Sequence, residues 1–197
     1  ACTQLLELNI KPRDILTFES FENAITMLNA VGGSTNGILH LLALANEVGI
    51  KLTYDDFERI RKKTPHIADM KPGGGYVMNS LDKIGGIPLI MKKLLDNNLI
   101  HGNVLTVTGK TIEENIKQYK ISSTAEQQIV REIENPLHGV GTAVILKGTL
   151  APEGAVIKTA GVEMTKFTGK ARVFDNEESA FDSVAKGEIN EGDVLVI

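Results

Sequence analysis

Glycines and small hydrogen-bonding residues interrupt an apolar stretch near the start of the chain, at AVGGSTNGILHLLALA, residues 30 to 45. After Gly33, the hydroxyl of Ser34 or Thr35 can cap the next predicted helix, because the first backbone N–H groups of a helix lack partners inside it. An anion such as a carboxylate can use the same donors, and the helix dipole favours negative charge there. The residues leave two roles open for this turn, a helix cap and an anion site.

Two other glycine-containing stretches do not form a nucleotide-binding loop. KPGGGYVM, residues 71 to 78, lacks the required spacing, and no predicted strand precedes it. In VLTVTGKT, Val104 takes the place of the first glycine of that motif. Three consecutive glycines in the first stretch instead predict a mobile or closely packed loop, a composition that active-site lids share.

The histidines and the single cysteine do not have the spacing of a metal site. His40 falls in a strongly apolar helical stretch, so a hydrogen-bonded core histidine is favoured over a catalytic one. Cys2 lies in an apolar, helical setting with no nearby base, which predicts an inert thiol. From the residues alone, no catalytic residue and no metal ligand is predicted.

Helices are predicted to position these groups in the first part of the chain. Thr17 can cap a helix that runs to about Ala30, where Gly32 and Gly33 end it. The helix of residues 36 to 48 is apolar nearly all round, which predicts burial. Further helix-start signals are Thr53 before YDDFERIRKK, Pro88 in IPLIMKKLLDNNL, and the capping-box pair Thr111 and Glu114.

After about residue 121 the pattern changes to short β-branched runs separated by turn residues. One helix interrupts them, with Asp175 or Asn176 as its cap and Gly187 as its stop. A helical half followed by a β half predicts an α/β protein in two parts, joined by residues 122 to 139.

Composition excludes several classes of partner. The 197 residues carry a net charge of −4, so a surface built for nucleic acid or anionic membrane is not expected. No apolar run approaches the roughly 20 residues that span a bilayer. The single cysteine excludes an internal disulfide framework and suits a reducing compartment.

Both ends of the sequence read as interior to a longer chain. It opens as ACTQLLELNI, already helical in pattern, and closes as GDVLVI, a strand-like run without a following turn. We therefore expect a fragment of a larger protein.

Several stretches together resemble the middle of the dihydroxy-acid dehydratases. They include SFENAITMLNAVGGSTNGILHLLALANEVGIKLTYDDFERI, PHIADMKPGGGYVMNSLDKIGGIPLIMKKLL, GNVLTVTGKTIEEN, GTLAPEGAVIKTAGV and ARVFDNEESAFDSVAKGEINEGDVLVI. GGSTN and LAPEGAVIKTAGV are shared across a wider family that includes sugar-acid and phosphogluconate dehydratases. LTVTGKT and KPGGGYVM are more similar to the enzyme of branched-chain amino-acid biosynthesis.

The resemblance implies a fold and a reaction. Residues 1–122 correspond to the helix-rich end of the N-terminal domain, and residues 123–197 to the first part of a C-terminal β-barrel domain of swivelling type. The family is made up of hydro-lyases that convert 2,3-dihydroxy carboxylates to 2-keto acids, here in valine, isoleucine and leucine biosynthesis. Such enzymes use an iron–sulfur cluster and Mg²⁺. The resemblance also implies a cytoplasmic enzyme that forms a homodimer at full length.

The metal ligands and the base of the family lie in motifs that this sequence does not contain. The cluster cysteines belong to CDK and CxGMxTANTM, the Mg²⁺-binding glutamate to YEGPKGGPGM, and the serine base to a DGRFSGG-like motif. Cys2 matches none of them, and one thiolate cannot hold a cluster. We expect the chain alone to bind no cofactor and to be inactive. Within a family of carboxylate substrates, Ser34, Thr35 and Asn36 become candidates for substrate binding, with a helix cap as the alternative.

Two other functions stay open at this point. One is a dehydratase of the same family that acts on sugar acids, either an aldonate or 6-phosphogluconate. The other is a binding or scaffold module without catalysis.

Overall fold

The computed structural model describes residues 2–119, 128–162 and 166–197 of the chain. Two compact units are present, residues 1–161 and residues 162–197. The expected boundary between residues 122 and 123 lies outside the described residues. The mixed α/β class is confirmed, because a helix-rich first part is followed by small sheets.

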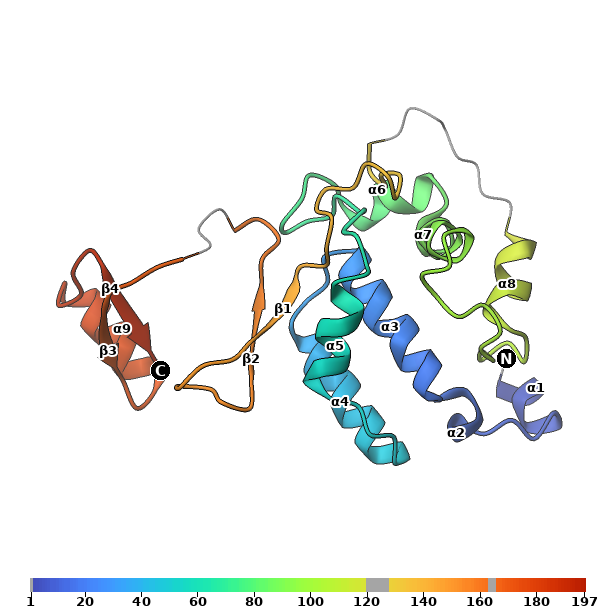
Figure 1. Ribbon diagram of the computed structural model, residues 1–197, viewed down its shortest axis with the longest axis horizontal. Helices are drawn as coiled ribbons and strands as arrows, with labels where there is room; N and C mark the ends of the chain where they lie inside the picture. Colours follow the sequence, from blue (N-terminus) through green and yellow to red (C-terminus); the bar gives the residue numbers. More distant parts are fainter. Residues whose placement is uncertain (1, 120–127, 163–165) are drawn as a thin grey trace. The chain divides into compact units, whose positions relative to one another are not determined.

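Eight helices are described in the first unit (Figure 1). They are α1 (Cys2–Glu7), α2 (Pro12–Ile15), α3 (Phe18–Ala30), α4 (Asn36–Val48), α5 (Tyr54–Arg61), α6 (Met78–Lys83), α7 (Gly86–Asp96) and α8 (Ile112–Gln118). Several of the predicted helix signals are confirmed. Thr17 caps α3 by accepting a hydrogen bond from the Ser20 N–H, and Gly49 ends α4 with φ +79°.

The strands form two separate two-stranded sheets in the described residues. In the first unit, β1 (Ala143–Leu146) pairs antiparallel with β2 (Ala155–Lys158), with Ala143 opposite Lys158. In the second, β3 (Lys170–Val173) pairs parallel with β4 (Asp193–Val196), and α9 (Glu177–Ala185) connects them. Asn176 caps α9 as predicted, because its Oδ1 accepts a hydrogen bond from the Ser179 N–H at 2.8 Å. These four strands do not close into a barrel.

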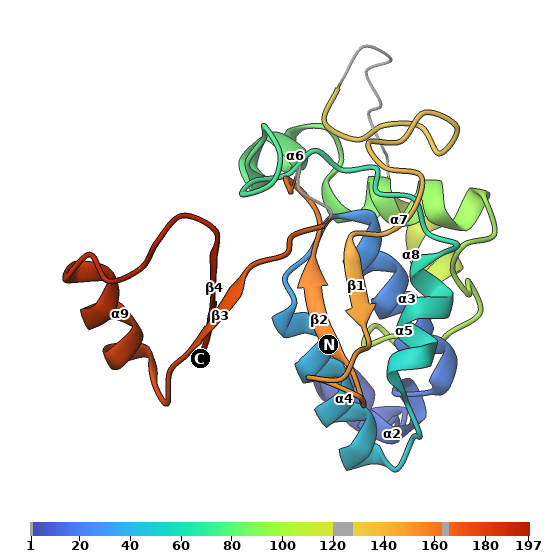
Figure 2. The same ribbon diagram turned by 60° about the vertical axis from the view of Figure 1, so that its left-hand side comes forward.

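Two apolar cores share α3 in the first unit. One core joins α3 to α4, α5 and β1 through Ile25, Ile38, Phe57 and Ala143. Figure 2 shows the β1–β2 hairpin on the same side of the unit as α4 and α5. The second core packs the end of α3 against α6, α7 and α8, with Ile67, Ile90 and Leu94 fully buried.

The predicted burial of α4 is wrong for the described residues. Only Ile38 and Ala45 of this helix are buried, while Leu39 and Leu44 are 59% and 48% exposed. One stripe of α4 packs against α3, and the side that carries Leu39 and Leu44 is exposed. A helix that is apolar on every side is fully buried only where neighbours cover every side. Because α4 packs against α3 on one side, its burial is partial. None of the helices in the described residues is long and apolar enough to cross a membrane.

Candidate functional site

The turn between α3 and α4 has the geometry of a close helix–helix connection. Gly32 adopts φ +60°, and the Gly33 N–H donates a hydrogen bond to the Leu28 carbonyl at 2.8 Å. Ser34 Oγ then accepts a hydrogen bond from the Asn36 N–H at 3.3 Å. The Thr35 side chain makes no capping hydrogen bond. Ser34 is therefore a weak cap for α4, and the Thr35 hydroxyl is not used for this purpose.

Two side chains explain the glycines of this turn. A Cβ atom on Gly32 would lie 2.6 Å from Nε2 of His66, and one on Gly37 would lie 2.8 Å from a methyl group of Leu28. Real Cβ atoms do not approach other heavy atoms so closely. The absence of side chains lets the turn lie directly against His66 and Leu28.

The predicted glycine-rich loop is held by its own hydrogen bonds. Asp69 accepts a hydrogen bond from the Gly75 N–H at 3.0 Å, and the Lys71 N–H donates to the Tyr76 carbonyl at 2.7 Å. Gly73 lies against Ala160, to whose Cβ an added Cβ would be 3.3 Å away. The loop KPGGGYVM therefore contacts the stretch VIKTAGV, although about 85 residues separate them along the chain.

A cavity of about 540 Å³ brings these three stretches together. Its lining includes Ser34 and Thr35 from the turn, Lys71 from the loop and Lys158 from β2. Asn36, which is exposed at the start of α4, is not part of this lining. The structure thus brings two of the three residues predicted from the sequence to one cavity.

The charge of the cavity comes from two lysines that sequence reasoning did not single out. In the described part of the chain, no carboxylate lies within ion-pairing distance of Lys71 or Lys158. Lys158 is half-buried and Lys71 is exposed. Both lysines stand in stretches that carry the family resemblance, but nothing in their local sequence indicates that they share a cavity.

The rest of the lining is apolar. Leu81 is buried beneath the cavity, whereas Met78 and Ile87 are 60% and 38% exposed. These two side chains belong to the first turns of α6 and α7. A concave, mostly apolar lining with a few polar groups is the usual composition of a small-molecule site.

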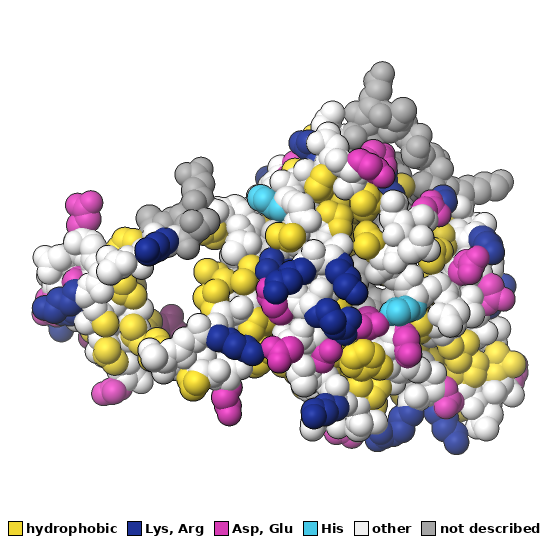
Figure 3. Space-filling view, viewed as in Figure 1, with side chains coloured by type: hydrophobic (Ala, Val, Ile, Leu, Met, Phe, Trp, Pro, Cys, Tyr) yellow, Lys and Arg dark blue, Asp and Glu magenta, His cyan; other side chains and the backbone are white. Residues whose placement is uncertain are grey.

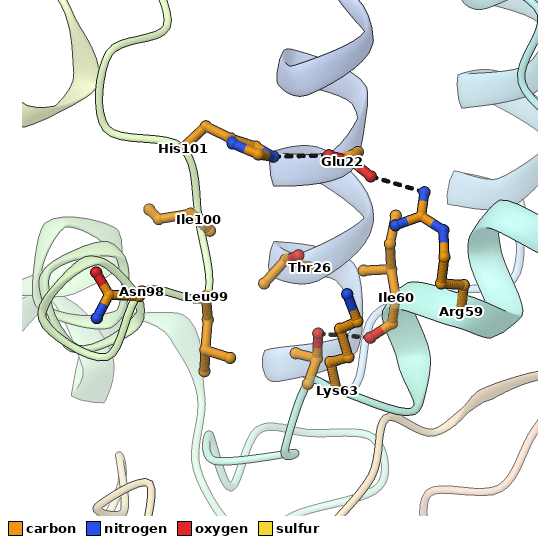
Figure 4. A pocket seen from close by; sticks show the side chains of 10 residues that line it. Glu22, Thr26, Arg59, Ile60, Lys63, Asn98, Leu99, Ile100 and His101 are labelled. Carbon is orange, nitrogen blue, oxygen red and sulfur yellow. Dashed lines mark hydrogen bonds and ion pairs between the residues drawn. The ribbon is translucent and has the colours of Figure 1, made fainter.

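A second, smaller cavity of about 170 Å³ lies between α3, α5 and the segment after α7. Figure 4 shows Glu22 between two partners in this cavity. Glu22 contacts Arg59 Nη2 at 2.7 Å and His101 Nε2 at 2.6 Å. Figure 3 shows how Lys and Arg side chains over α5 lie beside Asp and Glu side chains. Because the Glu22 carboxylate already contacts both Arg59 and His101, this cavity is less suited to a charged ligand than the first.

A metal centre does not fit the described residues. No group of three or more His, Cys, Asp or Glu side chains among them is arranged to hold a metal ion. His66 and His138 stack with ring centroids 5.3 Å apart, and His101 pairs with Glu22. Cys2 is exposed and is the only thiol of the chain. An iron–sulfur cluster needs several thiolate ligands, so these residues cannot supply its ligand set.

The chain belongs to the dihydroxy-acid/6-phosphogluconate dehydratase family. The N-terminal model of the family matches residues 1–115, and its C-terminal model matches residues 128–197. Dihydroxy-acid dehydratases from Saccharolobus islandicus, Saccharolobus solfataricus and Sulfolobus acidocaldarius are 59%, 58% and 57% identical to it over 197 residues. Each alignment covers 100% of this chain and 35% of the relative. The chain thus spans about a third of the length of these curated relatives.

Proposed function

We propose that this chain forms the substrate-binding middle of a hydro-lyase that dehydrates 2,3-dihydroxy carboxylates to 2-keto acids. The carrying observation is the cavity, in which Ser34 and Thr35 face a space that also holds two unpaired lysines. The 59% identity to dihydroxy-acid dehydratases supports this reaction. We place the enzyme in the biosynthesis of valine, isoleucine and leucine.

The reaction removes the proton at C2 and the hydroxyl group at C3, which leaves as water, and the resulting enol becomes the 2-keto acid. In this scheme, the hydroxyl groups of Ser34 and Thr35 contact the substrate at the start of α4. Asn36 belongs to the same proposed substrate-binding set, from a position beside the cavity. The complete enzyme would use an iron–sulfur cluster and Mg²⁺, for which the described residues offer no ligand set.

The test for the site is Thr35→Ala in the complete enzyme, because the Thr35 hydroxyl makes no capping hydrogen bond. If this hydroxyl contacts the substrate, KM rises or kcat falls with 2,3-dihydroxyisovalerate, while the melting temperature stays unchanged. A variant with full activity and a lower melting temperature would show that the residue serves only the helix. Ser34→Ala is the comparison variant, since Ser34 does cap α4.

The alternative substrate class is a sugar acid, because the matching family model also covers 6-phosphogluconate dehydratases. The exposed apolar side chains of Met78 and Ile87 favour an aliphatic substrate instead. Comparing turnover of 2,3-dihydroxyisovalerate, gluconate and 6-phosphogluconate by the complete protein distinguishes the classes. A protein that binds these acids without turning any of them over would support a binding module.

The remaining features of the whole protein are proposals from the family. We propose that residues 1–122 end its N-terminal domain and that residues 123–197 begin its C-terminal β-barrel domain. The match of the C-terminal family model to residues 128–197 supports this division. We further propose that the enzyme is cytoplasmic and forms a homodimer. Sedimentation of the complete protein tests the homodimer.

A further inference from the structure

We infer that the cavity sorts its ligand by chemistry, with Lys71 and Lys158 binding the carboxylate and Met78 and Ile87 contacting a branched aliphatic tail. The inference rests on the proposed function and deepens it, because it names the residues that select an aliphatic dihydroxy acid over a polyhydroxylated one. Neither the family match nor the resemblance assigns a role to these four residues.

The two lysines supply a charge that nothing else in the described chain neutralises. Lys71 comes from the loop after Met70 and Lys158 from the end of β2, so two separate segments each bring one ammonium group to the same cavity. Some lysines of the described chain have partners, for example Lys93 with Glu132 and Lys147 with Asp55 at 2.8 Å, whereas others on the surface, such as Lys51 and Lys83, make no ion pair. Lys71 and Lys158 stand out because they line one cavity. A ligand carboxylate would provide the missing opposite charge and accept charge-assisted hydrogen bonds from both groups.

The apolar side of the cavity determines which carboxylate fits. Met78 and Ile87 are exposed although they line a concave surface, and Leu81 lies buried behind them. Methyl groups placed against this wall would gain from leaving water. The hydroxyl groups of a sugar acid would lose their water there and find no hydrogen-bonding partner, which is costly.

The size of the cavity agrees with a small ligand. Its volume of about 540 Å³ lies in the range of pockets for small molecules. A 2,3-dihydroxy acid with a branched chain of four or five carbons can therefore place its carboxylate near the lysines and its methyl groups near Ile87.

The first experiment measures binding in the complete protein, apart from catalysis. The probe is 3-methyl-2-oxobutanoate, the 2-keto acid formed from 2,3-dihydroxyisovalerate, titrated calorimetrically. We expect Lys71→Gln and Lys158→Gln each to raise its Kd about tenfold, as expected for loss of one charge-assisted hydrogen bond. Lys158→Arg keeps the charge and should stay within about threefold of the original Kd. Lys147→Gln is the matched control, because that lysine pairs with Asp55 outside the cavity.

The second experiment measures selectivity. We expect Ile87→Asn to lower the ratio of kcat/KM for 2,3-dihydroxyisovalerate to that for gluconate by about tenfold or more. Met78→Gln should change the ratio in the same direction. The conservative variants Ile87→Leu and Met78→Leu keep the wall apolar and should preserve the ratio, which separates a change of chemistry from a change of packing.

The two experiments distinguish failure of this inference from failure of the proposed function. If the protein turns over dihydroxy acids but the lysine variants keep the original Kd and the wall variants keep the original ratio, the inference is overturned. If the protein turns over none of the acids, yet binds the keto acid in a lysine-dependent manner, the proposed reaction fails and the site stands. Melting temperatures of all variants show whether a change in Kd comes from binding or from loss of the folded state.

Discussion

Gly32 occupies a backbone conformation that only glycine adopts easily, directly beside the ring of His66. The positive φ ends α3, and the missing side chain lets the turn approach the buried histidine. Both requirements fall on Gly32, two positions before Ser34, which belongs to the proposed substrate-binding set. Its replacement therefore tests whether the turn is positioned by this contact.

We expect Gly32→Ala to destabilise the protein by about 2 kcal/mol. Alanine is strained at the positive φ of this residue, and its Cβ would lie 2.6 Å from His66 Nε2. Urea unfolding measures the loss as a lower midpoint at unchanged slope. Gly139→Ala is the matched control, since an added Cβ there meets nothing within 4 Å. Equal midpoints for the two variants would contradict the proposed contact.

His66 is buried with its Nδ1 atom unpartnered among the described residues. Burial lowers the pKa of His66 from its ordinary value of 6.5, and the neighbouring His138 lowers it further. Lys158 also acts to lower this pKa, whereas Asp69 acts to raise it. The imidazole is therefore held neutral beside the turn.

This lowered pKa predicts a loss of stability in mild acid. Above pH 6.5 the histidine is neutral in both states; as the pH falls below 6.5, the unfolded chain takes up the proton first, which favours unfolding. We expect the free energy of unfolding to decrease as the pH falls below 6.5, and His66→Leu to flatten that slope. His40→Gln, at an exposed position, is the control variant. An unchanged slope in His66→Leu would show that other groups cause the effect.

At the level of elements, α3 organises the first unit through two asparagine side chains. Asn23 donates to the His101 carbonyl at 2.9 Å and accepts from the His101 N–H at 2.7 Å. Asn29 donates to the Ile25 carbonyl at 2.9 Å and accepts from the Ala143 N–H at 3.3 Å. One helix thus fixes the backbone of two segments far away in the sequence, one of which leads directly into β1.

Asn29→Leu should cost about 2 kcal/mol of stability, because the buried Ala143 N–H loses the side-chain oxygen that it contacts. Thermal unfolding followed by circular dichroism measures the loss. The matched control is Asn97→Leu at an exposed site. Asn97 donates to the Lys93 carbonyl four residues earlier at 2.9 Å, just as Asn29 donates to the Ile25 carbonyl. There water can replace the lost partner, so a loss as large as that of Asn29→Leu would argue against the burial effect.

Helix ends were predictable because their signals are local. Thr17, Thr53, Thr111 and Gly49 act on backbone groups within a few residues, and each stands where the pattern predicted. The burial of α4 was not predictable, because an apolar sequence shows what a helix can bury and not what covers it. The pairing of β3 with β4 was also hidden, since α9 lies between these strands in the sequence.

At the scale of the whole molecule, the site depends on contacts that no local pattern contains. The turn at Ser34 was visible from its residue types, but Lys71 and Lys158 reach the same cavity only after the loop folds against the stretch that follows β2. The sequence left a helix cap and an anion site open for this turn; the folded chain adds two lysines and an apolar wall beside it, on which the proposed selectivity rests.

The remaining whole-molecule prediction concerns activity. The described residues contain no set of three metal-ligating side chains, and the chain spans about 35% of the length of its dehydratase relatives. We expect the 197-residue chain, incubated with iron, sulfide and Mg²⁺ under anaerobic conditions, to form no 2-keto acid from 2,3-dihydroxyisovalerate. The complete protein treated in the same way is the control and should turn over the substrate.

Calorimetry with 3-methyl-2-oxobutanoate on the short chain adds a readout that does not depend on turnover, because the cavity is built entirely from residues 31–158. Formation of product by the short chain would mean that its own side chains suffice for the reaction. The proposal that this region binds the substrate while the rest of the enzyme holds the cofactors would then be wrong.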